Sequence, residues 1–250
     1  VRGVGGEGAH VVVHEAGVRA EPGEAGSSIG GPKQPGFAAG EFEIQDAGSQ
    51  AIAAAVQARP GERVADWCAG AGGKTLALAA QMGGRGVLVA LDVHRGRLAE
   101  GKRRLLRAGV DQVVVRHHAD RVRGNEPKKG FDAVLVDAPC SSSGALRRTP
   151  ELRWHLDGDW LGRFPDQQLA ILRQAAGRVR RGGRLIYATC SILNAENEEV
   201  VRRFLADASG WQLVDERRQG PADASYMATG PLPAVGPDGF YHASLVHTHD

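Results

Sequence analysis

The chain has 250 residues, 42% of them hydrophobic, which is enough to bury one substantial core. Its formal net charge of +2 is smaller than the basic excess of most dedicated nucleic-acid-binding domains, so any contact with a polyanion must come from a local patch or a separate domain. Three cysteines form neither an even disulfide set nor a C-x-x-C metal pair, and no apolar run is long enough to cross a bilayer. We therefore expect a cytoplasmic protein with no metal site and no membrane partner, and not a secreted disulfide scaffold.

The first 36 residues differ in composition from the rest of the chain. They are rich in Gly, Glu, Pro and Ser, and their one β-like run is the short segment 11–13. Such a segment has little apolar surface to bury, so we expect residues 1–36 to be a linker or the remnant of a truncated region, and residues 37–250 to form the main domain. Because the sequence starts at Val1 without an initiator Met, we also expect further residues upstream.

From residue 51 onward, helical patterns alternate with short apolar runs that are bounded by Gly or Asp. Ala51–Val56 is Ala-rich and is closed by Arg-Pro-Gly, which predicts a helix. The apolar runs predict strands, which cover residues 64–68, 87–92, 113–115, 133–137 and 185–189. These strands are apolar throughout, as is typical of parallel strands that are covered on both faces. The predicted fold class is therefore α/β, a doubly wound and mostly parallel sheet.

The C-terminal part departs from this alternation. Residues 211–215 and 240–247 are both strand-like, and no clear helical pattern separates them. Antiparallel strands, unlike parallel ones, need no crossover helix between them. We therefore expect an antiparallel hairpin at one edge of the sheet.

A glycine-rich turn follows the first predicted strand, in the run Asp66–Thr75 (DWCAGAGGKT), and a helix is expected to begin near Lys74. Glycines in such a turn let the backbone approach a ligand closely, and the free N–H groups of the helix point toward it. A tight turn without a ligand is the alternative. A phosphate-binding P-loop is excluded, because G-x-x-x-x-G-K-[ST] requires Gly at position 68, where this chain has Cys68.

An acid, Asp92, ends the second predicted strand. A carboxylate at that place can accept hydrogen bonds from both hydroxyls of a ribose, in nicotinamide cofactors and in methionine-derived adenosyl cofactors alike. The alternative role is to cap the helix that follows. The acid alone therefore does not identify the cofactor.

Two cysteines and a second acid occur at the ends of the last two parallel strands. Asp137 ends the strand at 133–137 and Cys140 follows it, while Cys190 comes directly after the strand at 185–189. Open α/β sheets bind ligands at the carboxyl ends of their strands. A single Cys there is more often a small buried hydrophobe, but two cysteines at neighbouring strand ends, one beside an acid, favour a chemical role.

Methylation of cytosine at carbon 5 makes use of such a set of groups. Carbon 5 is a poor nucleophile until a thiolate adds to carbon 6, after which the ring can attack the sulfonium methyl group of a cofactor. An acid at the N3 edge of the cytosine, a role for Asp137, neutralises charge as the adduct forms. After methyl transfer a base removes the proton on carbon 5, and a second thiol, Cys140, can assist release of the product.

These segments, in their order along the chain, resemble the Sun (Fmu, RsmB-like) family of RNA 5-methylcytosine methyltransferases. The family's cofactor motif D-x-C-A-A-P-G-G-K-T is matched at Asp66–Thr75, except that Gly70 and Ala71 replace Ala-Pro. D-A-P-C-S-G-x-G is matched at Asp137–Gly144, with Ser142 in place of one Gly. The other matches are Q-D-x-A-S-Q at Gln45–Gln50 with Gly48 for Ala, T-C-S at Thr189–Ser191, N-E-x-x-V around Glu196–Glu199, and D-G-F at Asp238–Phe240.

The resemblance implies a Rossmann-like class I methyltransferase domain over residues 37–250, with S-adenosylmethionine as the cofactor. It implies Cys190 as the nucleophile and Cys140 as the thiol that assists release. Spacing alone does not assign these roles, since DNA cytosine methyltransferases use the Pro-Cys motif as the nucleophile. The implied cofactor contacts are Cys68, Ala69, Gly70, Ala71, Gly72, Gly73, Lys74, Asp92, Asp120 and Asp137. The departure at positions 70 and 71 removes a Pro that stiffens the cofactor turn.

Basic residues after the Cys140 loop are the candidates for RNA contacts. Those that can hold phosphates are Arg147, Arg148 and Arg153, although an ordinary solvated face is the alternative. The basic run 101–107 is expected to be the exposed face of a helix on the sheet. Trp154 and Phe240 can stack on a base, but core packing is favoured for both. We expect ribosomal RNA as the substrate ahead of transfer RNA, a target base that is flipped out of its stack, and a monomeric protein.

Two other functions are compatible with part of this pattern. A nicotinamide-dependent oxidoreductase would use the glycine-rich turn and Asp92 but leaves both thiols without a role. A catalytically degenerate methyltransferase fold, acting as an RNA-binding or ribosome-assembly module, would have the same fold but would transfer no methyl group. Calorimetry with S-adenosylmethionine and with NADH separates the oxidoreductase from a methyltransferase.

Overall fold

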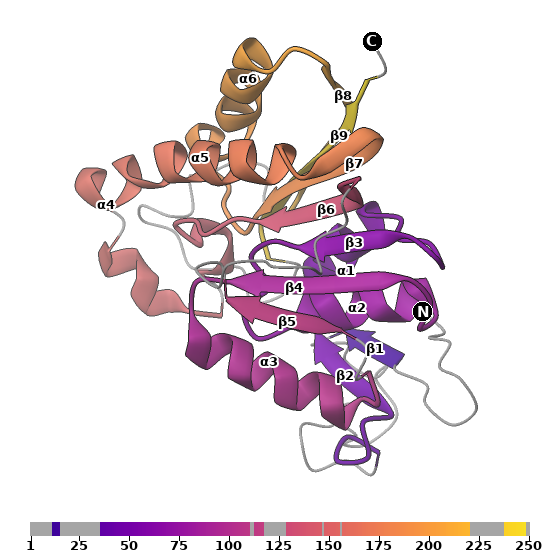
Figure 1. The fold of residues 1–250 in the computed structure, drawn as a ribbon. Helices are drawn as coiled ribbons and strands as arrows, with labels where there is room; N and C mark the ends of the chain where they lie inside the picture. The colour runs from indigo at the N-terminus through magenta and orange to yellow at the C-terminus, as the bar shows by residue number, and fades with distance from the viewer. Residues whose placement is uncertain are drawn as a thin grey trace, which may run out of the picture. The chain divides into compact units, whose positions relative to one another are not determined.

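The computed structural model describes residues 12–15, 36–110, 113–117, 129–146, 148–155, 157–220 and 238–248 (Figure 1). The chain forms two compact units. The first unit comprises Val1–Glu62 and Ala69–Arg121, and the second comprises Arg63–Cys68 and Val122–Asp250. The first strand of the predicted parallel series therefore belongs to the same unit as the C-terminal half of the chain.

The first unit contains two parallel strand pairs among its described residues. β1 (Val12–Glu15) pairs with β2 (Phe42–Gln45), and β4 (Val87–Asp92) pairs with β5 (Val114–His117). Its described helices are α1 (Ala47–Ala55), α2 (Gly73–Met82) and α3 (Arg95–Arg107).

Side-chain hydrogen bonds hold α1 and α2 in place. Asp46 caps α1 by accepting the Gly48 N–H at 2.8 Å, which satisfies a helix donor that would otherwise be unpaired. Gln81 of α2 donates to the Ala53 carbonyl at 2.9 Å and accepts the Ala58 N–H at 3.0 Å. Because α2 follows directly from the glycine-rich turn, this packing also restrains the end of that turn.

β2 is not predicted from the sequence, because it has only four residues and one of its buried side chains is Glu43. In the structure Glu43 is 6% exposed and accepts hydrogen bonds from Arg104 at 3.2 Å and Arg107 at 2.5 Å. A buried acid is tolerated when it is paired in this way. Both partners lie on α3, 61 and 64 residues further along the chain, so no local pattern reveals them.

The second unit is built on one sheet with the strand order β3-β6-β7-β9-β8. β3 (Arg63–Asp66), β6 (Phe131–Asp137) and β7 (Val179–Thr189) run parallel, whereas β9 (Phe240–His247) is antiparallel to both β7 and β8 (Trp211–Gln219). Its described α-helices are α4 (Gly158–Gly162), α5 (Phe164–Ala176) and α6 (Glu198–Asp207). Its described 3-10 helices are η1 (Ser143–Ala145), η2 (Pro150–His155) and η3 (Asn194–Glu196).

The core of the second unit lies at β6 and β7, against which α5 packs (Figure 1). Leu135 and Tyr187 are fully buried, and the ring of Tyr187 meets that of Tyr241 edge-on with centroids 6.2 Å apart. Asp137 ends β6, and Cys190 directly follows β7. The candidate catalytic groups are therefore attached to buried strands that α5 packs against.

The α/β class, the mostly parallel strands and the antiparallel hairpin near the C-terminus are confirmed. β7 is longer than predicted, because it begins at Val179 and continues through Gly182 and Gly183, which interrupt its apolar pattern. Among the described residues, no helix is long and apolar enough to cross a membrane.

Candidate active site

In the first unit the glycine-rich turn is tied to the end of β4. The Ala69 N–H donates to the Leu91 carbonyl at 2.8 Å, and the Gly70 N–H donates to the Asp92 carboxylate at 2.9 Å. The other oxygen of Asp92 accepts the His94 N–H at 2.7 Å, so this acid does cap the turn into α3. Each carboxylate oxygen can accept a second hydrogen bond. The capping role therefore does not prevent Asp92 from binding ribose hydroxyls.

Two glycines of this turn have left-handed backbone, with φ of +53° at Gly70 and +80° at Gly72, a conformation that strains other residues. A Cβ at Gly72 would lie 3.3 Å from the Gly101 Cα, so α3 passes very close to the turn. Arg104 Nη1 donates to the Ala71 carbonyl at 2.8 Å, which holds the turn where the family motif has a Pro. Gly101 and Arg104 are not predicted as site residues. Their signal in the sequence is the i, i+3 spacing that places them on one face of α3.

The remaining residues of the predicted cofactor turn lie at its two ends. Cys68 belongs to the second unit and is partly exposed. Gly73 begins α2, and Gly72 before it supplies no side-chain cap. Lys74 donates to the Ser49 hydroxyl at 3.3 Å, which ties the start of α2 to α1.

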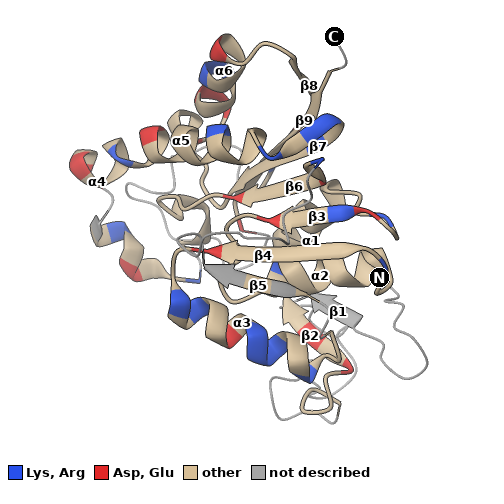
Figure 2. Cartoon of the chain, viewed as in Figure 1, with Lys and Arg blue, Asp and Glu red and all other residues tan. Residues whose placement is uncertain are grey.

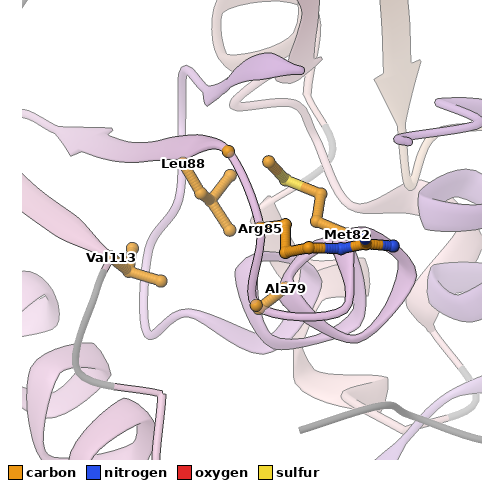
Figure 3. Close-up of a pocket in the computed structure, with 7 residues that line it drawn as sticks. Ala79, Met82, Arg85, Leu88 and Val113 are labelled. Carbon is orange, nitrogen blue, oxygen red and sulfur yellow. The ribbon is translucent and has the colours of Figure 1, made fainter. Parts of the chain in front are cut away.

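A small pocket of the first unit adjoins the amino end of β4, away from Asp92 (Figure 3). It is lined by Ala79, Met82, Gly84, Arg85, Gly86, Leu88 and Val113. β4 begins at Val87 and ends at Asp92, so the pocket adjoins the amino end of the strand, whereas Asp92 is at the carboxyl end. This pocket is therefore not the candidate cofactor site.

Cys140 and Cys190 are brought together in the second unit. Their Sγ atoms are 3.3 Å apart, and the Cys190 thiol donates to the Ser142 hydroxyl at 3.4 Å. The Gly144 N–H donates to the Cys190 carbonyl at 2.9 Å, so backbone contacts also join the two loops. Both cysteines are partly exposed, which leaves them accessible to a substrate.

Ser142 occupies a position at which the family motif has Gly. Its φ is +57°, in the left-handed region where glycine is favoured. Serine at this position therefore brings a hydroxyl to Cys190 at the expense of backbone strain.

The surroundings of Cys140 favour its neutral thiol. The hydrogen bond with the Cys190 sulfur, burial, and the nearby charges of Cys190 and Glu196 raise the pKa of Cys140 well above its usual range. A thiol with a raised pKa keeps its proton at neutral pH and is a poor nucleophile. Two thiols this close favour a state in which at least one of them keeps its proton, so the pair can offer a nucleophile and a proton donor side by side.

Asp137 lies on the strand next to the Cys190 loop. It pairs with Ala188 of β7 in the sheet register, and the Ala138 N–H donates to the Ala188 carbonyl at 2.8 Å. Cys190 is two residues beyond Ala188, so the acid and the thiol lie at neighbouring strand ends, as predicted from the sequence.

Among the residues predicted to contact RNA, Arg148 forms an ion pair with the buried carboxylate of Asp238. Arg153 is partly buried, and its Nε has no hydrogen-bond partner in the part of the chain that the structure describes. Arg147, and Asp120 among the predicted cofactor residues, lie outside the described residues.

Core packing is confirmed for Phe240, which is 4% exposed, but is wrong for Trp154, which is 82% exposed. The short helix η2 carries Trp154 at the surface, a feature that residue type alone does not reveal. Lys and Arg residues recur along α3 (Figure 2). Lys102 and Arg103 are exposed, as predicted for the basic run, whereas the two other arginines of that run pair with β2.

Comparisons with known proteins agree with these features. The family described as 16S rRNA methyltransferase RsmB/F matches residues 53–246. Ribosomal RNA small subunit methyltransferase B of Pseudomonas syringae pv. tomato is 35% identical over 220 residues, which cover 85% of this chain and 48% of that protein. The chain spans about half the length of the curated relatives it matches.

Two solved structures show the same fold. The crystal structure of PH0851 has a TM-score of 0.74 and 33% identity, covering 85% of this chain and 48% of that one. NSun6 from Pyrococcus horikoshii, solved with SFG, has a TM-score of 0.72 and 23% identity, covering 88% of this chain and 57% of that one.

Proposed function

Because the chain belongs to the RsmB/F family of 16S rRNA methyltransferases, we propose that it transfers a methyl group from S-adenosylmethionine to carbon 5 of a cytosine in RNA. The observation that carries this proposal is the pair of thiols, Cys140 and Cys190, whose Sγ atoms are 3.3 Å apart. A nicotinamide-dependent oxidoreductase makes no use of this pair. Residues 37–250 form the proposed catalytic domain, and residues 1–36 are proposed as a linker or as the remnant of a truncated RNA-binding region, of which Val12–Glu15 pairs with β2.

Cys190 is the nucleophile of the proposed reaction. Its thiolate adds to carbon 6 of the cytosine, and the electron pair of the C5–C6 double bond moves toward N3, where the carboxyl group of Asp137 contacts the ring edge and stabilises it as the adduct forms. S-adenosylmethionine, when bound, supplies an electrophilic methyl group. Carbon 5 forms a bond to the methyl group as the bond between sulfur and methyl breaks, which gives S-adenosylhomocysteine and leaves carbon 5 tetrahedral, still carrying its proton.

Release of the product reverses the addition. A base takes the proton from carbon 5, the double bond re-forms, and the bond between carbon 6 and the Cys190 sulfur breaks. Cys140 keeps its thiol proton because its pKa is raised, and it lies 3.3 Å from the departing sulfur. A proton donor at that position stabilises the leaving thiolate and so favours its departure.

The residues of the glycine-rich turn fit an adenosyl cofactor. The carboxylate of Asp92 can accept the ribose hydroxyls, and the left-handed Gly70 and Gly72 let the backbone approach a ligand. The cofactor residues we propose are Cys68, Ala69, Gly70, Ala71, Gly72, Gly73, Lys74, Asp92, Asp120 and Asp137.

We propose small-subunit ribosomal RNA as the substrate ahead of transfer RNA. Support comes from the names of the curated relatives, which are ribosomal RNA small subunit methyltransferases B. Phosphate contacts are proposed for Arg147, Arg148 and Arg153, beside the Cys140 loop.

The test is a methylation assay with labelled S-adenosylmethionine and two substrates, protein-free small-subunit ribosomal RNA and transfer RNA. Mass spectrometry of the digested nucleosides should find 5-methylcytidine from the ribosomal RNA. Cys190→Ala should lower the rate by about 1000-fold or more, since it removes the nucleophile. A different methylated nucleoside, or appreciable turnover by Cys190→Ala, would refute the proposed chemistry. Binding of the cofactor with no methylation of either RNA would favour the degenerate binding module.

A further inference from the structure

Glu196 is a buried acid between the two thiol loops, and it is only 1% exposed. Its Oε2 accepts the Ser141 N–H at 2.8 Å, and its Oε1 accepts the Ser191 hydroxyl at 2.8 Å. Ser141 directly follows Cys140, and Ser191 directly follows Cys190. One carboxylate therefore bridges the residues that come next to the two thiols.

A glutamine completes the link on the Cys140 side. Gln168 of α5 donates through its Nε2 to Glu196 Oε2 at 2.9 Å and to the Pro139 carbonyl at 3.0 Å. Pro139 and Ser141 flank Cys140, so both neighbours of this thiol are held by the same pair of side chains. Hydrogen bonds to a carboxylate are roughly twice as strong as those between neutral groups.

The residue after Glu196 strengthens the link on the Cys190 side. Asn197 accepts the Thr189 hydroxyl at 2.6 Å and donates to the Ser191 carbonyl at 2.9 Å. Thr189 and Ser191 flank Cys190. The carbonyl of Glu196 also accepts the Tyr187 hydroxyl at 2.5 Å, which anchors η3 to the core of β7.

We propose that Glu196 is the positioning residue of the thiol pair: its carboxylate holds the loops of Cys140 and Cys190 so that both thiols reach one cytosine. A carboxylate fits this place because three donors point at it: the Ser141 N–H, the Gln168 side-chain amide and the Ser191 hydroxyl. The amide of a glutamine would turn an N–H group toward one of these donors. The charge of Glu196 also contributes to the raised pKa of Cys140. The assignment rests on the proposed function, to which it adds the group that sets the geometry of the two thiols.

The test compares Glu196→Gln with a matched control, Glu199→Gln. Both changes remove one carboxylate charge and preserve side-chain size, but Glu199 lies on α6 with its side chain 42% exposed and pairs with Arg202. For each variant we would measure thermal unfolding, kcat and the KM for S-adenosylmethionine with ribosomal RNA as the substrate, and the pH dependence of iodoacetamide alkylation at Cys140, resolved by peptide mass spectrometry.

For a folded Glu196→Gln we expect kcat to fall about tenfold, as for a misplaced catalytic group, with KM for S-adenosylmethionine within about twofold of the parent value. Alkylation of Cys140 should move to lower pH, because a negative charge that raises its pKa is gone. Glu199→Gln should match the parent protein in all measurements. A folded Glu196→Gln whose alkylation profile and kcat both match those of Glu199→Gln overturns the assignment.

If Glu196→Gln does not fold, Ser191→Ala tests the same link, because it removes one donor and leaves the carboxylate in place. A fall in kcat of about threefold is expected, and an unchanged kcat overturns the assignment. Alkylation needs neither RNA nor cofactor, so it tests the positioning role of Glu196 separately from the proposed methyltransferase activity. A parent protein that methylates no RNA, but whose Cys140 profile shifts in Glu196→Gln, refutes the proposed function and supports the role of Glu196.

Discussion

The hydroxyl at position 142 is carried by a backbone that glycine would adopt more readily. Ser142 has φ of +57°, and its hydroxyl accepts the Cys190 thiol at 3.4 Å. A left-handed conformation costs a non-glycine residue roughly 1–2 kcal/mol. Replacing Ser142 with glycine would remove this strain, but the greater conformational freedom of glycine in the unfolded chain offsets roughly 0.5–1 kcal/mol of the gain in stability.

Ser142→Gly should therefore raise the free energy of unfolding by about 0.5–1 kcal/mol, measured by urea denaturation. The control is Ser209→Gly, in the exposed turn between α6 and β8, where φ is not positive. There the same change should lower the free energy of unfolding by about 0.5 kcal/mol. Destabilisation of equal size by both variants would show that position 142 is not strained.

At the scale of elements, the close approach of α3 to the glycine-rich turn is a strong constraint on the candidate cofactor site. A Cβ at Gly101 would lie 3.2 Å from the Ala71 carbonyl carbon, which is tighter than ordinary packing. Gly101→Ala should therefore displace the turn and weaken binding of S-adenosylmethionine about tenfold by calorimetry, equivalent to about 1.4 kcal/mol.

Gly96→Ala is the matched control on the same helix, because a Cβ there meets nothing within 4 Å. It should leave the affinity for S-adenosylmethionine unchanged and stabilise the protein by up to about 1 kcal/mol through helix propensity. Equal affinities of the two variants would mean that the turn tolerates a shift of α3.

Asp132 links three strands of the second unit. From β6 it accepts the Arg63 N–H of β3 at 2.7 Å and the Arg180 Nε of β7 at 2.5 Å, and its side chain is 13% exposed. Burial alone would raise the pKa of Asp132, but hydrogen bonds and charge from Arg63 and Arg180 outweigh burial and hold it well below its usual range. The stabilisation is therefore present above the unfolded-state pKa and is lost as the pH falls below about 4.

Asp132→Asn should lower the free energy of unfolding by about 2–3 kcal/mol at pH 7, because two arginines lose their charged partner. The difference from the parent protein should shrink below about pH 4, where the Asp132 carboxylate of the unfolded parent takes up a proton while that of the folded protein does not, which favours unfolding. Asp207→Asn, which removes the partner of Arg173 where the Asp207 side chain is 62% exposed, should cost less than about 1 kcal/mol. Denaturation curves at several pH values would measure both, and a pH-independent difference would contradict the account of Asp132.

The apolar sequence pattern predicts those strands whose own side chains are mostly apolar and buried. β4 and β6 are recognised because nearly every side chain in them is buried. β2 and the first half of β7 are not, because Glu43 needs partners on α3 and Gly182 and Gly183 carry no apolar side chain. The apolar pattern therefore predicts strands that are buried among apolar residues. Strands that depend on distant ion pairs, or that glycines interrupt, are recognised only in the tertiary structure.

On the scale of the whole molecule, most residues proposed to bind the cofactor belong to one unit, and those proposed for catalysis belong to the other. The turn at 69–74 and Asp92 belong to the first unit, whereas Asp137, Cys140 and Cys190 belong to the second. Motifs predict these residues because each lies at or just beyond the carboxyl end of a strand, where open α/β sheets bind ligands.

The supporting residues are less visible in the sequence than the reactive ones. Arg104 reaches Ala71 from 33 residues away, and Glu196 reaches Ser141 from 55 residues away. Such contacts form only when distant elements pack together. The motif around Glu196–Glu199 therefore marks Glu196 without indicating what it holds, and no motif marks Arg104.

The central claim is that Cys190 forms a covalent bond to cytosine and that Cys140 is needed to break it. The most direct measurement mixes Cys140→Ala protein with ribosomal RNA and labelled S-adenosylmethionine and separates the products on a denaturing gel. The account predicts a labelled protein–RNA adduct that disappears when Cys190 is also replaced by Ala. Methylated RNA that is released normally by Cys140→Ala, or an adduct that persists without Cys190, would contradict it.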